Sequence, residues 1–322
     1  MEYSKKIKLL SGIIVLLLVS YIAGTIFSSG NMNKKRASQP IFDKAVINKI
    51  SAIKIDLQEE GSLLLQKEDQ KWSYMYNNKK YPAPADKIEN FIDSVFKCTK
   101  FQLAGSNSKT WDKFDLIEGK SKDAFFYDSS NNELFSLHIG KKGPTEGSGE
   151  YIRTSLSDEV YLIDAPIIRY FLRDRTYWSY LRVLPEDVDS NTIGSVKIKT
   201  DDRFSDAQAK INFSMKREYS NNNFEWKDVN GKVIDKNSAD MLLNNIASFS
   251  ADSFSNDHIT TDKNAEIEIE TDAYGRMIFD IKVLREQNAL IGIRGGDYIY
   301  ESSLYKIERI LISVERIIEE LK

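Results

Sequence analysis

The stretch KWSYMYNNKKYPAPADKIENFIDSVF, from Lys71 to Phe96, decides the fold. Its opening places aromatic side chains at alternate positions, as a half-buried β-strand does. Pro84 can begin a helix, because the missing N–H of proline costs nothing in the first turn. Ile88, Phe91 and Val95 then recur at i, i+3 and i+7, which forms one apolar helix face. The stretch therefore predicts a strand followed by a helix that packs on a sheet.

A second copy of this pattern lies later in the chain. Trp226 is followed by an Asn-Gly turn and by a helical run that ends near Phe249. In both copies an Ala-Asp pair comes thirteen residues after the tryptophan. Upstream, the alternating run Ile193 to Lys199 repeats Ile50 to Asp56 almost position by position. Internal repetition of one structural unit is the strongest conclusion that the sequence supports.

Later segments extend the match between the copies. Gly295 to Ile299 resembles Gly149 to Ile152, and the C-terminal helical run takes the place of a short helix at Ile167 to Leu172. Strands dominate this order and do not alternate with helices, so a parallel sheet is not indicated. We predict an α+β fold in which two similar units of mainly antiparallel sheet, with helices packed on them, follow an N-terminal transmembrane helix. The predicted units are residues 41–184 and the more divergent residues 185–322.

The N-terminal segment has the pattern of a membrane anchor. No charged residue occurs from Leu9 to Phe27, and nineteen helical residues span about 28 Å, close to the thickness of the hydrocarbon core. A cleaved signal peptide is the alternative, although its apolar core is usually shorter. The predicted layout is a cytoplasmic tail at residues 1–8, an anchor at 9–27 that contacts the lipid bilayer, and a flexible linker at 28–40. Lysines flank the anchor on both sides, so the orientation with the domains outside the cytoplasm rests on the shortness of the tail.

Composition excludes several classes of function. The net charge is −3, so the chain as a whole is not suited to nucleic acid. A single cysteine, Cys98, can form neither an intrachain disulfide nor a thiolate cluster. The two histidines, His138 and His258, have no histidine or cysteine at ligand spacing. We therefore predict no cofactor, no metal and no catalytic residue.

Two further groups of residues have a functional and a structural interpretation. The glycines of Gly140 to Gly149 and of Gly292 to Gly296 lie between strands, where hairpin turns explain them better than a phosphate site at a helix N-terminus. Glu266, Glu268 and Glu270 share one strand face, which could hold calcium only with oxygens from loops. A solvated face with the isoleucines turned inward is the simpler interpretation.

A cluster near the junction of the copies is the best candidate for function. Five aromatic residues and four arginines occur between Arg169 and Arg182, and Tyr, Trp and Arg dominate the hot spots of protein interfaces. Packing between the two units is the alternative, because such junctions also bury aromatic rings. The candidate interaction surface consists of Tyr170, Arg173, Arg175, Tyr177, Trp178, Tyr180 and Arg182.

Several short motifs, taken together, resemble a known family. They are the Ile-x-x-Ile-x-Ile opening at Ile50, Trp72, Pro84-Ala85-Asp86, Gly140, Tyr151-Ile-Arg153, Val160-Tyr-Leu-Ile163, Arg173-Asp-Arg175 and Arg182. Their order and spacing are similar to domain-of-unknown-function family 4340, over Ile41 to Leu184 and more loosely in the second copy. The resemblance implies one N-terminal span, an extracytoplasmic location and ABC-transporter subunits of the gliding-motility type as partners. It implies no catalytic or ligand-binding residue.

Three hypotheses follow. The first is a non-enzymatic, membrane-anchored interaction module that serves as an accessory or scaffold component of an ABC-transporter-type envelope complex. The second is a binding protein for an envelope glycan or peptide in the groove between the repeats. The third, an enzyme, has no motif to support it.

Overall fold

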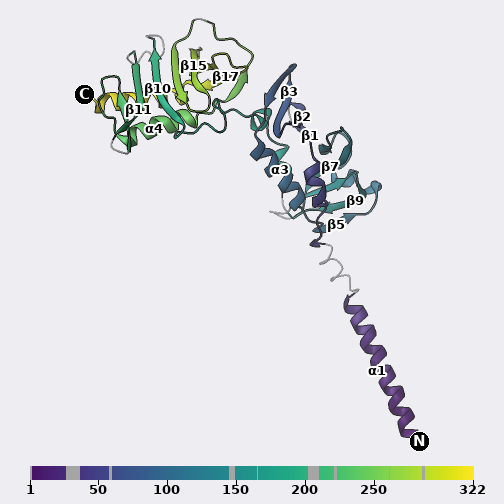
Figure 1. The fold of residues 1–322 in the computed structure, drawn as a ribbon. Helices are drawn as coiled ribbons and strands as arrows, with labels where there is room; N and C mark the ends of the chain where they lie inside the picture. The colour runs from purple at the N-terminus through teal and green to yellow at the C-terminus, as the bar shows by residue number, and fades with distance from the viewer. Residues whose placement is uncertain are drawn as a thin grey trace. The chain divides into compact units, whose positions relative to one another are not determined.

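The computed structural model describes residues 2–26, 37–57, 60–144, 149–164, 166–201, 210–220, 223–260, 262–284 and 287–322. These residues form two compact units, Met1–Tyr180 and Leu181–Lys322, which are described separately (Figure 1). Most of the predicted linker at 28–40, and Phe27 of the predicted anchor, lie outside the described residues. The predicted limits of the five segments stay predictions.

The chain begins with α1 (Glu2–Ile26), a helix of 25 residues. Within the part of the chain that the structure describes, no helix is both long and apolar enough to cross a membrane. The transmembrane assignment of Leu9 to Phe27 stays a prediction.

Unit 1 is built on one antiparallel sheet of nine strands in the order β4-β3-β2-β1-β6-β7-β8-β9-β5. Each strand pairs antiparallel with its neighbour, and the turns at Asp69-Gln70 and Asn77-Asn78 take the positive φ angles that tight hairpins require. The strands are β1 (Ala52–Leu57), β2 (Gly61–Glu68), β3 (Lys71–Tyr76), β4 (Lys79–Pro82), β5 (Gln102–Gly105), β6 (Lys122–Tyr127), β7 (Glu133–Lys142), β8 (Glu150–Thr154) and β9 (Ser157–Leu162).

One face of this sheet is covered by α3 (Ala85–Lys97), as the sequence predicts. The apolar side of α3 is buried, and the Phe91 ring stacks 6.0 Å from that of Phe126 on β6. Phe171 and Trp178 meet the same Phe91 ring edge-on, at 5.8 and 5.7 Å. The helix is thus held between the sheet and the aromatic segment that carries η4 (Ile168–Tyr170) and η5 (Arg175–Trp178).

The opposite face of the unit 1 sheet is covered over its later strands by the segment that carries η2 (Ser108–Thr110) and η3 (Asp112–Phe114). Phe114 and Leu116 from this segment cluster with Val160 of β9. Gly140 lies in β7, and a Cβ atom there would approach the Phe114 carbonyl oxygen to 1.9 Å. The glycine is needed for this close approach of backbone and not for a hairpin turn, which corrects the sequence interpretation.

Unit 2 has an antiparallel sheet of eight strands in the order β12-β11-β10-β14-β15-β16-β17-β13. This is the unit 1 order, except that an isolated bridge between Lys227 and Val233 takes the place of β4 beside β12. The elements are β10 (Ile193–Thr200), β11 (Asn212–Ser220), β12 (Asn223–Asp228), β13 (Ser253–Ser255), β14 (Ala265–Thr271), β15 (Gly275–Val283), β16 (Asn288–Ile293), β17 (Ile299–Ser303), α4 (Lys236–Ala247) and α5 (Leu304–Glu320). The α+β class with two antiparallel sheets is confirmed.

One sequence match between the copies is wrong. Gly295 to Ile299 leads into β17, which pairs with β13 as β9 pairs with β5 in unit 1. Gly149 to Ile152 instead leads into β8. The Tyr-Ile dipeptide that both segments share led to a match that is wrong by one strand. The strand orders of the two sheets show that β17 corresponds to β9, and that β16 corresponds to β8.

The two helices of unit 2 lie on one face of its sheet (Figure 1). Leu242 and Ile246 of α4 and Leu311 and Val314 of α5 are buried in a single core with the inward side chains of the strands. Asn245 of α4 also donates a hydrogen bond to Ser313 of α5 at 2.9 Å. Helix α5 therefore covers the flank of α4, the position that the aromatic segment takes beside α3 in unit 1.

Candidate functional site

A surface pocket of about 390 Å³ lies in unit 1 where α3 meets the aromatic segment. One wall comes from consecutive turns of α3, and the other comes from η4, η5 and the residues between them. Since α3 buries its apolar side, its polar residues are left to face the segment. The lining residues are Asn90, Asp93, Ser94, Lys97, Arg169, Tyr170, Arg173 and Tyr177.

Buried rings and one capping residue hold the segment in place. Phe171 and Trp178 are both 0% exposed, and they fix the segment on α3 through Phe91. Asp174 caps η5 by accepting hydrogen bonds from the Thr176 hydroxyl at 2.5 Å and from the Tyr177 N–H at 3.0 Å. The bond from Thr176, assisted by the backbone N–H of Tyr177, lowers the pKa of Asp174. The pocket wall is therefore anchored in the core of unit 1.

Tyr170 joins the two walls of the pocket. Its hydroxyl lies 2.9 Å from the Ser94 hydroxyl and donates to the Asn90 carbonyl oxygen at 3.2 Å. Arg169 stacks on the Tyr170 ring at 5.0 Å and donates to its hydroxyl at 3.3 Å. The contacts with Ser94 and Asn90 join positions 76 and 80 residues apart in the sequence. Tyr170 thus closes the floor of the pocket and orients Arg169 at its rim.

The Tyr177 ring contacts two cations. The Arg173 guanidinium lies 5.1 Å from the ring centre, and the Lys87 amine lies 4.7 Å from it. Lys87 also donates to the Tyr177 carbonyl oxygen at 3.0 Å. Burial, with the nearby Tyr170, raises the pKa of Tyr177, so its hydroxyl stays protonated at neutral pH and can donate a hydrogen bond.

The pocket carries an excess of positive charge. Lys97 pairs with the single carboxylate, Asp93, at 3.4 Å on an exposed helix face. Arg169 and Arg173 are exposed, and neither forms an ion pair within the described part of the chain. Guanidinium groups bind carboxylates and phosphates in a two-point geometry. The arrangement is suited to an anionic group that approaches from solvent.

The seven predicted interaction residues are distributed over several environments. Tyr170, Arg173 and Tyr177 line the pocket. Trp178 is fully buried, so its side chain offers no surface to a partner. Arg175 stacks on Tyr76 at 3.4 Å and pairs with Glu60 at 3.5 Å. The part that the seven residues play in an interaction stays a prediction.

The other two members of the predicted set make backbone contacts. The Tyr180 N–H donates to the Pro82 carbonyl oxygen at 2.9 Å, which attaches the end of the segment to β4. Arg182 lies in unit 2 and donates to the carbonyl oxygens of Ala247, Glu186 and Val188. Arg182 therefore holds a loop to the end of α4.

Lys97 and Arg169 belong to the pocket but not to the predicted set. Arg169 is the first residue of the aromatic and arginine cluster at residues 169–182, and Lys97 is the last residue of α3. The available signal was the polar face of α3, on which Asn90, Asp93 and Lys97 recur at helical spacing. Which segment would lie beside that face is a property of the tertiary structure.

His138 has partners that its sequence neighbours do not reveal. It lies opposite Asp123 in the register of β6 and β7, and its Nδ1 is 2.9 Å from Asp123 Oδ1. Its Nε2 is 3.2 Å from the Ser136 hydroxyl. Burial opposes ionisation of Asp123, but hydrogen bonds from His138 and Ser121 outweigh it and lower the Asp123 pKa. The order serine, histidine, carboxylate is that of a hydrolase triad, yet Ser136 is only 3% exposed, so the geometry supports a buried strand-to-strand network.

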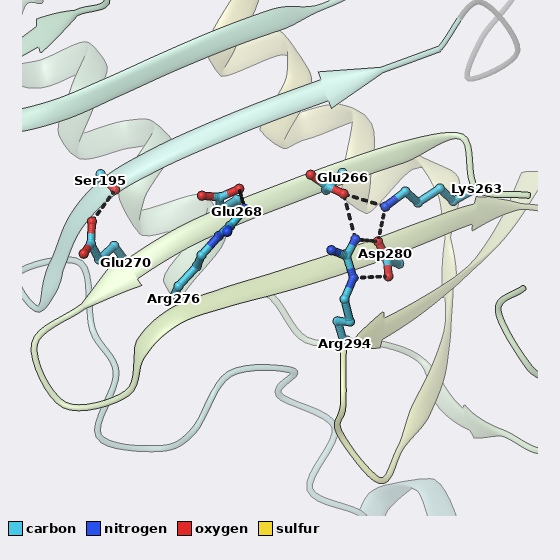
Figure 2. A network of polar contacts seen from close by, with 8 residues as sticks. All are labelled: Ser195, Lys263, Glu266, Glu268, Glu270, Arg276, Asp280 and Arg294. Carbon is cyan, nitrogen blue, oxygen red and sulfur yellow. Dashed lines mark hydrogen bonds and ion pairs between the residues drawn. The ribbon is translucent and has the colours of Figure 1, made fainter. Parts of the chain in front are cut away.

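The three glutamates on β14 lie on the outer face of the unit 2 sheet, where cations neutralise Glu266 and Glu268 (Figure 2). Arg294 pairs with both Glu266 and Asp280 at 2.7 Å, and Lys263 bridges the same two carboxylates at 2.5 and 2.7 Å. Hydrogen bonding from Lys263 lowers the Glu266 pKa against the opposing effect of burial. The predicted inward position of Ile267 and Ile269 is confirmed, whereas the Glu266 and Glu268 side chains are only 20% exposed because their ion pairs cover them.

The remaining outer carboxylates of β14 also have partners. Arg276 pairs with Glu268 at 2.7 Å, and Glu270 accepts a hydrogen bond from Ser195 at 3.3 Å (Figure 2). Among the described residues, no three or more histidine, cysteine, aspartate or glutamate side chains converge as a metal site requires. The face is a network of ion pairs within the sheet.

Comparison with known proteins gives one finding. The family model described as a domain of unknown function (DUF4340) matches residues 72–269, which extend from β3 of unit 1 into β14 of unit 2. No curated protein and no solved structure matches the chain. Because the family model covers more than half of the chain, the protein belongs to the DUF4340 family of domains of unknown function.

Proposed function

We propose that this protein is a non-enzymatic, membrane-anchored interaction module that binds an acidic segment of a protein partner at the pocket beside α3. The partner is a subunit of an ABC-transporter-type envelope complex, and the two units lie outside the cytoplasm. The single observation that carries the proposal is the pair Arg169 and Arg173, exposed at the pocket rim and without an ion pair among the described residues.

The chemistry of the pocket supports a protein partner with negative charge. An exposed guanidinium group gains most from a carboxylate that it can bind with two parallel hydrogen bonds. Tyr177, in contact with Arg173 and Lys87, adds a hydroxyl and an aromatic surface at little cost in side-chain entropy. Arginine and tyrosine are also the residues on which binding energy concentrates in protein interfaces.

The membrane location rests on the N-terminal sequence. Leu9 to Phe27 carries no charge, and the apolar side chains from Ile13 to Val19 are about half exposed or more. Exposed apolar residues along a helix need a partner surface, which a bilayer provides. The transporter-type partner rests on the family resemblance, and the alternative of a ligand in the groove between the repeats stays a prediction.

The test is extraction of the tagged full-length protein from its native membrane, followed by mass spectrometry of the proteins that co-purify. We expect ATPase and membrane subunits of an ABC transporter to co-purify with the wild type. The double variant Arg169→Ala/Arg173→Ala should reduce their yield at least tenfold, because both rim cations are lost while the buried rings stay in place. Raising the salt concentration should weaken the wild-type complex in the same direction.

The matched control is Lys44→Ala/Lys109→Ala, which removes two exposed cations of unit 1 that do not line the pocket. It should leave the yield unchanged. The proposal fails if no transporter subunit co-purifies, or if the control and the pocket variant lose the partner equally. Trp178→Ala is unsuitable for this purpose, because loss of a fully buried ring disrupts unit 1 itself.

A further inference from the structure

The chain that leads from the predicted anchor enters unit 1 at one end of its sheet. Residues 39–41 run antiparallel to residues 98–100, joined by an isolated bridge and by N–H···O hydrogen bonds of 3.0 and 3.3 Å. In this register Ser38 comes opposite Phe101, the residue that precedes β5. The linker therefore reaches unit 1 beside Phe101.

The length of the linker keeps this end of unit 1 close to a bilayer. The inference rests on the membrane anchor of the proposed function, which ends at Phe27. Residues 28–37 separate Phe27 from Ser38, and ten residues reach at most about 35 Å. A flexible chain of this length has a root-mean-square span of only about 17 Å. The surface around Phe101 is therefore held at a high effective concentration beside the lipid headgroups.

Phe101 is suited to contact with lipid. Its side chain is 53% exposed at the edge of the sheet. An exposed apolar ring gains free energy when it enters the boundary between headgroups and acyl chains. The preceding residue, Lys100, places its amine 5.1 Å from the centre of the Tyr161 ring, so a cation lies next to this apolar side chain in the sequence. Aromatic and basic side chains together are typical of surfaces that lie on membranes.

Further lysines lie at the same end of the sheet. Because neighbouring strands are antiparallel, the first residues of β5 and β6 and the last residues of β7 share one end. Lys122 begins β6 there, and Lys141 and Lys142 end β7, three strands or about 14 Å from β5. Lys113 joins Lys141, since their amines lie 5.5 and 5.9 Å from the centre of the Phe114 ring. We name this surface the basic end, and it consists of Lys100, Phe101, Lys113, Lys122, Lys141 and Lys142.

Positive charge exceeds negative charge at the basic end. None of its five lysines forms an ion pair with the residues that the structure describes. The accessible carboxylates nearby are Asp115, Glu118 and Asp164. A further one, Glu150, is buried, which raises its pKa and favours its neutral form. Lysine side chains are long enough to reach headgroup phosphates while their stems stay on the protein.

We propose that the basic end of unit 1 docks on the anionic headgroups of the bilayer that holds the anchor, with Phe101 inserted among them. The linker already holds the two surfaces together, so a weak intrinsic affinity suffices for docking. Each lysine near an anionic surface strengthens the contact about fivefold. Docking fixes which end of unit 1 faces the membrane. The β8–β9 turn with Leu156, at the opposite end of the sheet, then points away from it.

The test places the fluorophore NBD at position 101 of the full chain, reconstituted in vesicles that carry a nitroxide on the lipid acyl chains. Phe101→Cys supplies the attachment point, and burial raises the pKa of Cys98 to about 12, so that thiol does not compete for the label. Leu156→Cys is the matched control, because Leu156 is 65% exposed at the opposite end of the sheet. In vesicles of phosphatidylcholine with phosphatidylglycerol, we expect quenching at 101 to be at least threefold stronger than at 156. Equal quenching at the two positions overturns the proposal.

The role of charge is tested at position 101 as well. Removal of phosphatidylglycerol, or the variant Lys141→Gln/Lys142→Gln, should lower quenching at 101 at least twofold. The control Lys71→Gln/Lys109→Gln removes two exposed lysines at the opposite end of the sheet and should change nothing. Quenching that depends on neither the lipid charge nor the basic end contradicts the assignment.

Retention of the chain in the vesicle fraction separates this proposal from the one on which it rests. A chain that does not stay with the vesicles refutes the anchor, and docking with it. A retained chain whose label at 101 is unquenched refutes docking alone. If the label is unquenched in vesicles but shifts to blue emission in native membranes, a protein covers the basic end and the lipid proposal is wrong.

Discussion

The two units share one strand order but differ in what covers the sheet and its first helix. In unit 1 the flank of α3 is covered by an aromatic segment without regular helix, whereas α5 covers the flank of α4 in unit 2. On the opposite face, unit 1 has the segment around Phe114, and unit 2 has an exposed network of ion pairs. The sheet is therefore the common scaffold, and the covers are where the units have acquired different surfaces.

This difference explains the position of the candidate site. A regular helix such as α5 packs with an apolar face, and the polar groups that it places beside α4 pair across the two helices, as Asn245 and Ser313 do. The irregular segment of unit 1 inserts a few large rings instead, and between them it presents Arg169, Arg173 and Tyr177 to solvent. The same short segment therefore buries its large rings in the core and exposes its arginines to solvent.

The largest loss of stability is expected when the central buried side chain is removed from the aromatic segment of unit 1 or from α5 of unit 2. Trp178→Ala should destabilise unit 1 by about 3–5 kcal/mol, and Leu311→Ala should destabilise unit 2 by about 2–5 kcal/mol, since both side chains are buried in a core. Hydrogen exchange followed by mass spectrometry should show faster exchange in the affected unit. If hydrogen exchange in unit 1 of Trp178→Ala stays as slow as in the wild type, packing of the aromatic segment does not stabilise unit 1.

The cover on the other face of unit 1 is tested at Gly140. Gly140→Ala places a Cβ against the Phe114 carbonyl oxygen and should cost about 1–3 kcal/mol by lifting this segment. In unit 2, Gly194→Ala is the control, because its Cβ would meet nothing closer than the Glu270 carbonyl oxygen at 3.7 Å. Urea unfolding measures both. Equal midpoints for the two variants would contradict the close approach.

A buried carboxylate makes unit 1 sensitive to pH. Glu150 accepts a hydrogen bond from the Ile167 N–H at 3.0 Å, but burial outweighs this and raises the Glu150 pKa. The neutral form is therefore favoured on folding, and its contribution to stability, present at low pH, is lost as the pH rises through the raised pKa. Glu150→Gln should flatten this dependence in urea unfolding at pH 4 to 8, while the exposed Glu133→Gln should not.

The smallest effect is expected on the exposed face of unit 2. Arg294 is about half exposed although it contacts two carboxylates, so Arg294→Ala should cost less than about 1 kcal/mol and less still in high salt. Thermal unfolding at low and high ionic strength measures this. A loss as large as that of Leu311→Ala would mean that the network, and not the helical side, stabilises the unit 2 sheet.

Periodicity and repetition in the sequence predicted much of the fold. The alternating strands, the helix after Pro84 and the second helix after Asp235 follow from local patterns that burial on one face imposes. The match of Gly295 to Ile299 was wrong, because short motifs recur while only hydrogen-bonded pairing distinguishes neighbouring strands.

The candidate sites could be predicted less well. The pocket beside α3 joins Asn90 with Arg169, and the His138 network joins residues through strand register. Both depend on tertiary packing between distant segments. Composition did indicate the aromatic and arginine cluster. It could not separate the buried Trp178 from the exposed arginines, because tryptophan and arginine are both typical of interface hot spots and tryptophan also packs in domain cores.

The central claim is that the irregular cover of unit 1, and not the helical cover of unit 2, meets the partner. The most direct test places a photo-crosslinking phenylalanine analogue at Tyr177 of the pocket or at the exposed Ile312 of α5, in the full-length protein in its native membrane. Cross-links to a transporter-type subunit from position 177, and not from 312, are the predicted result. Cross-links from 312 alone, or equally from both positions, would contradict it.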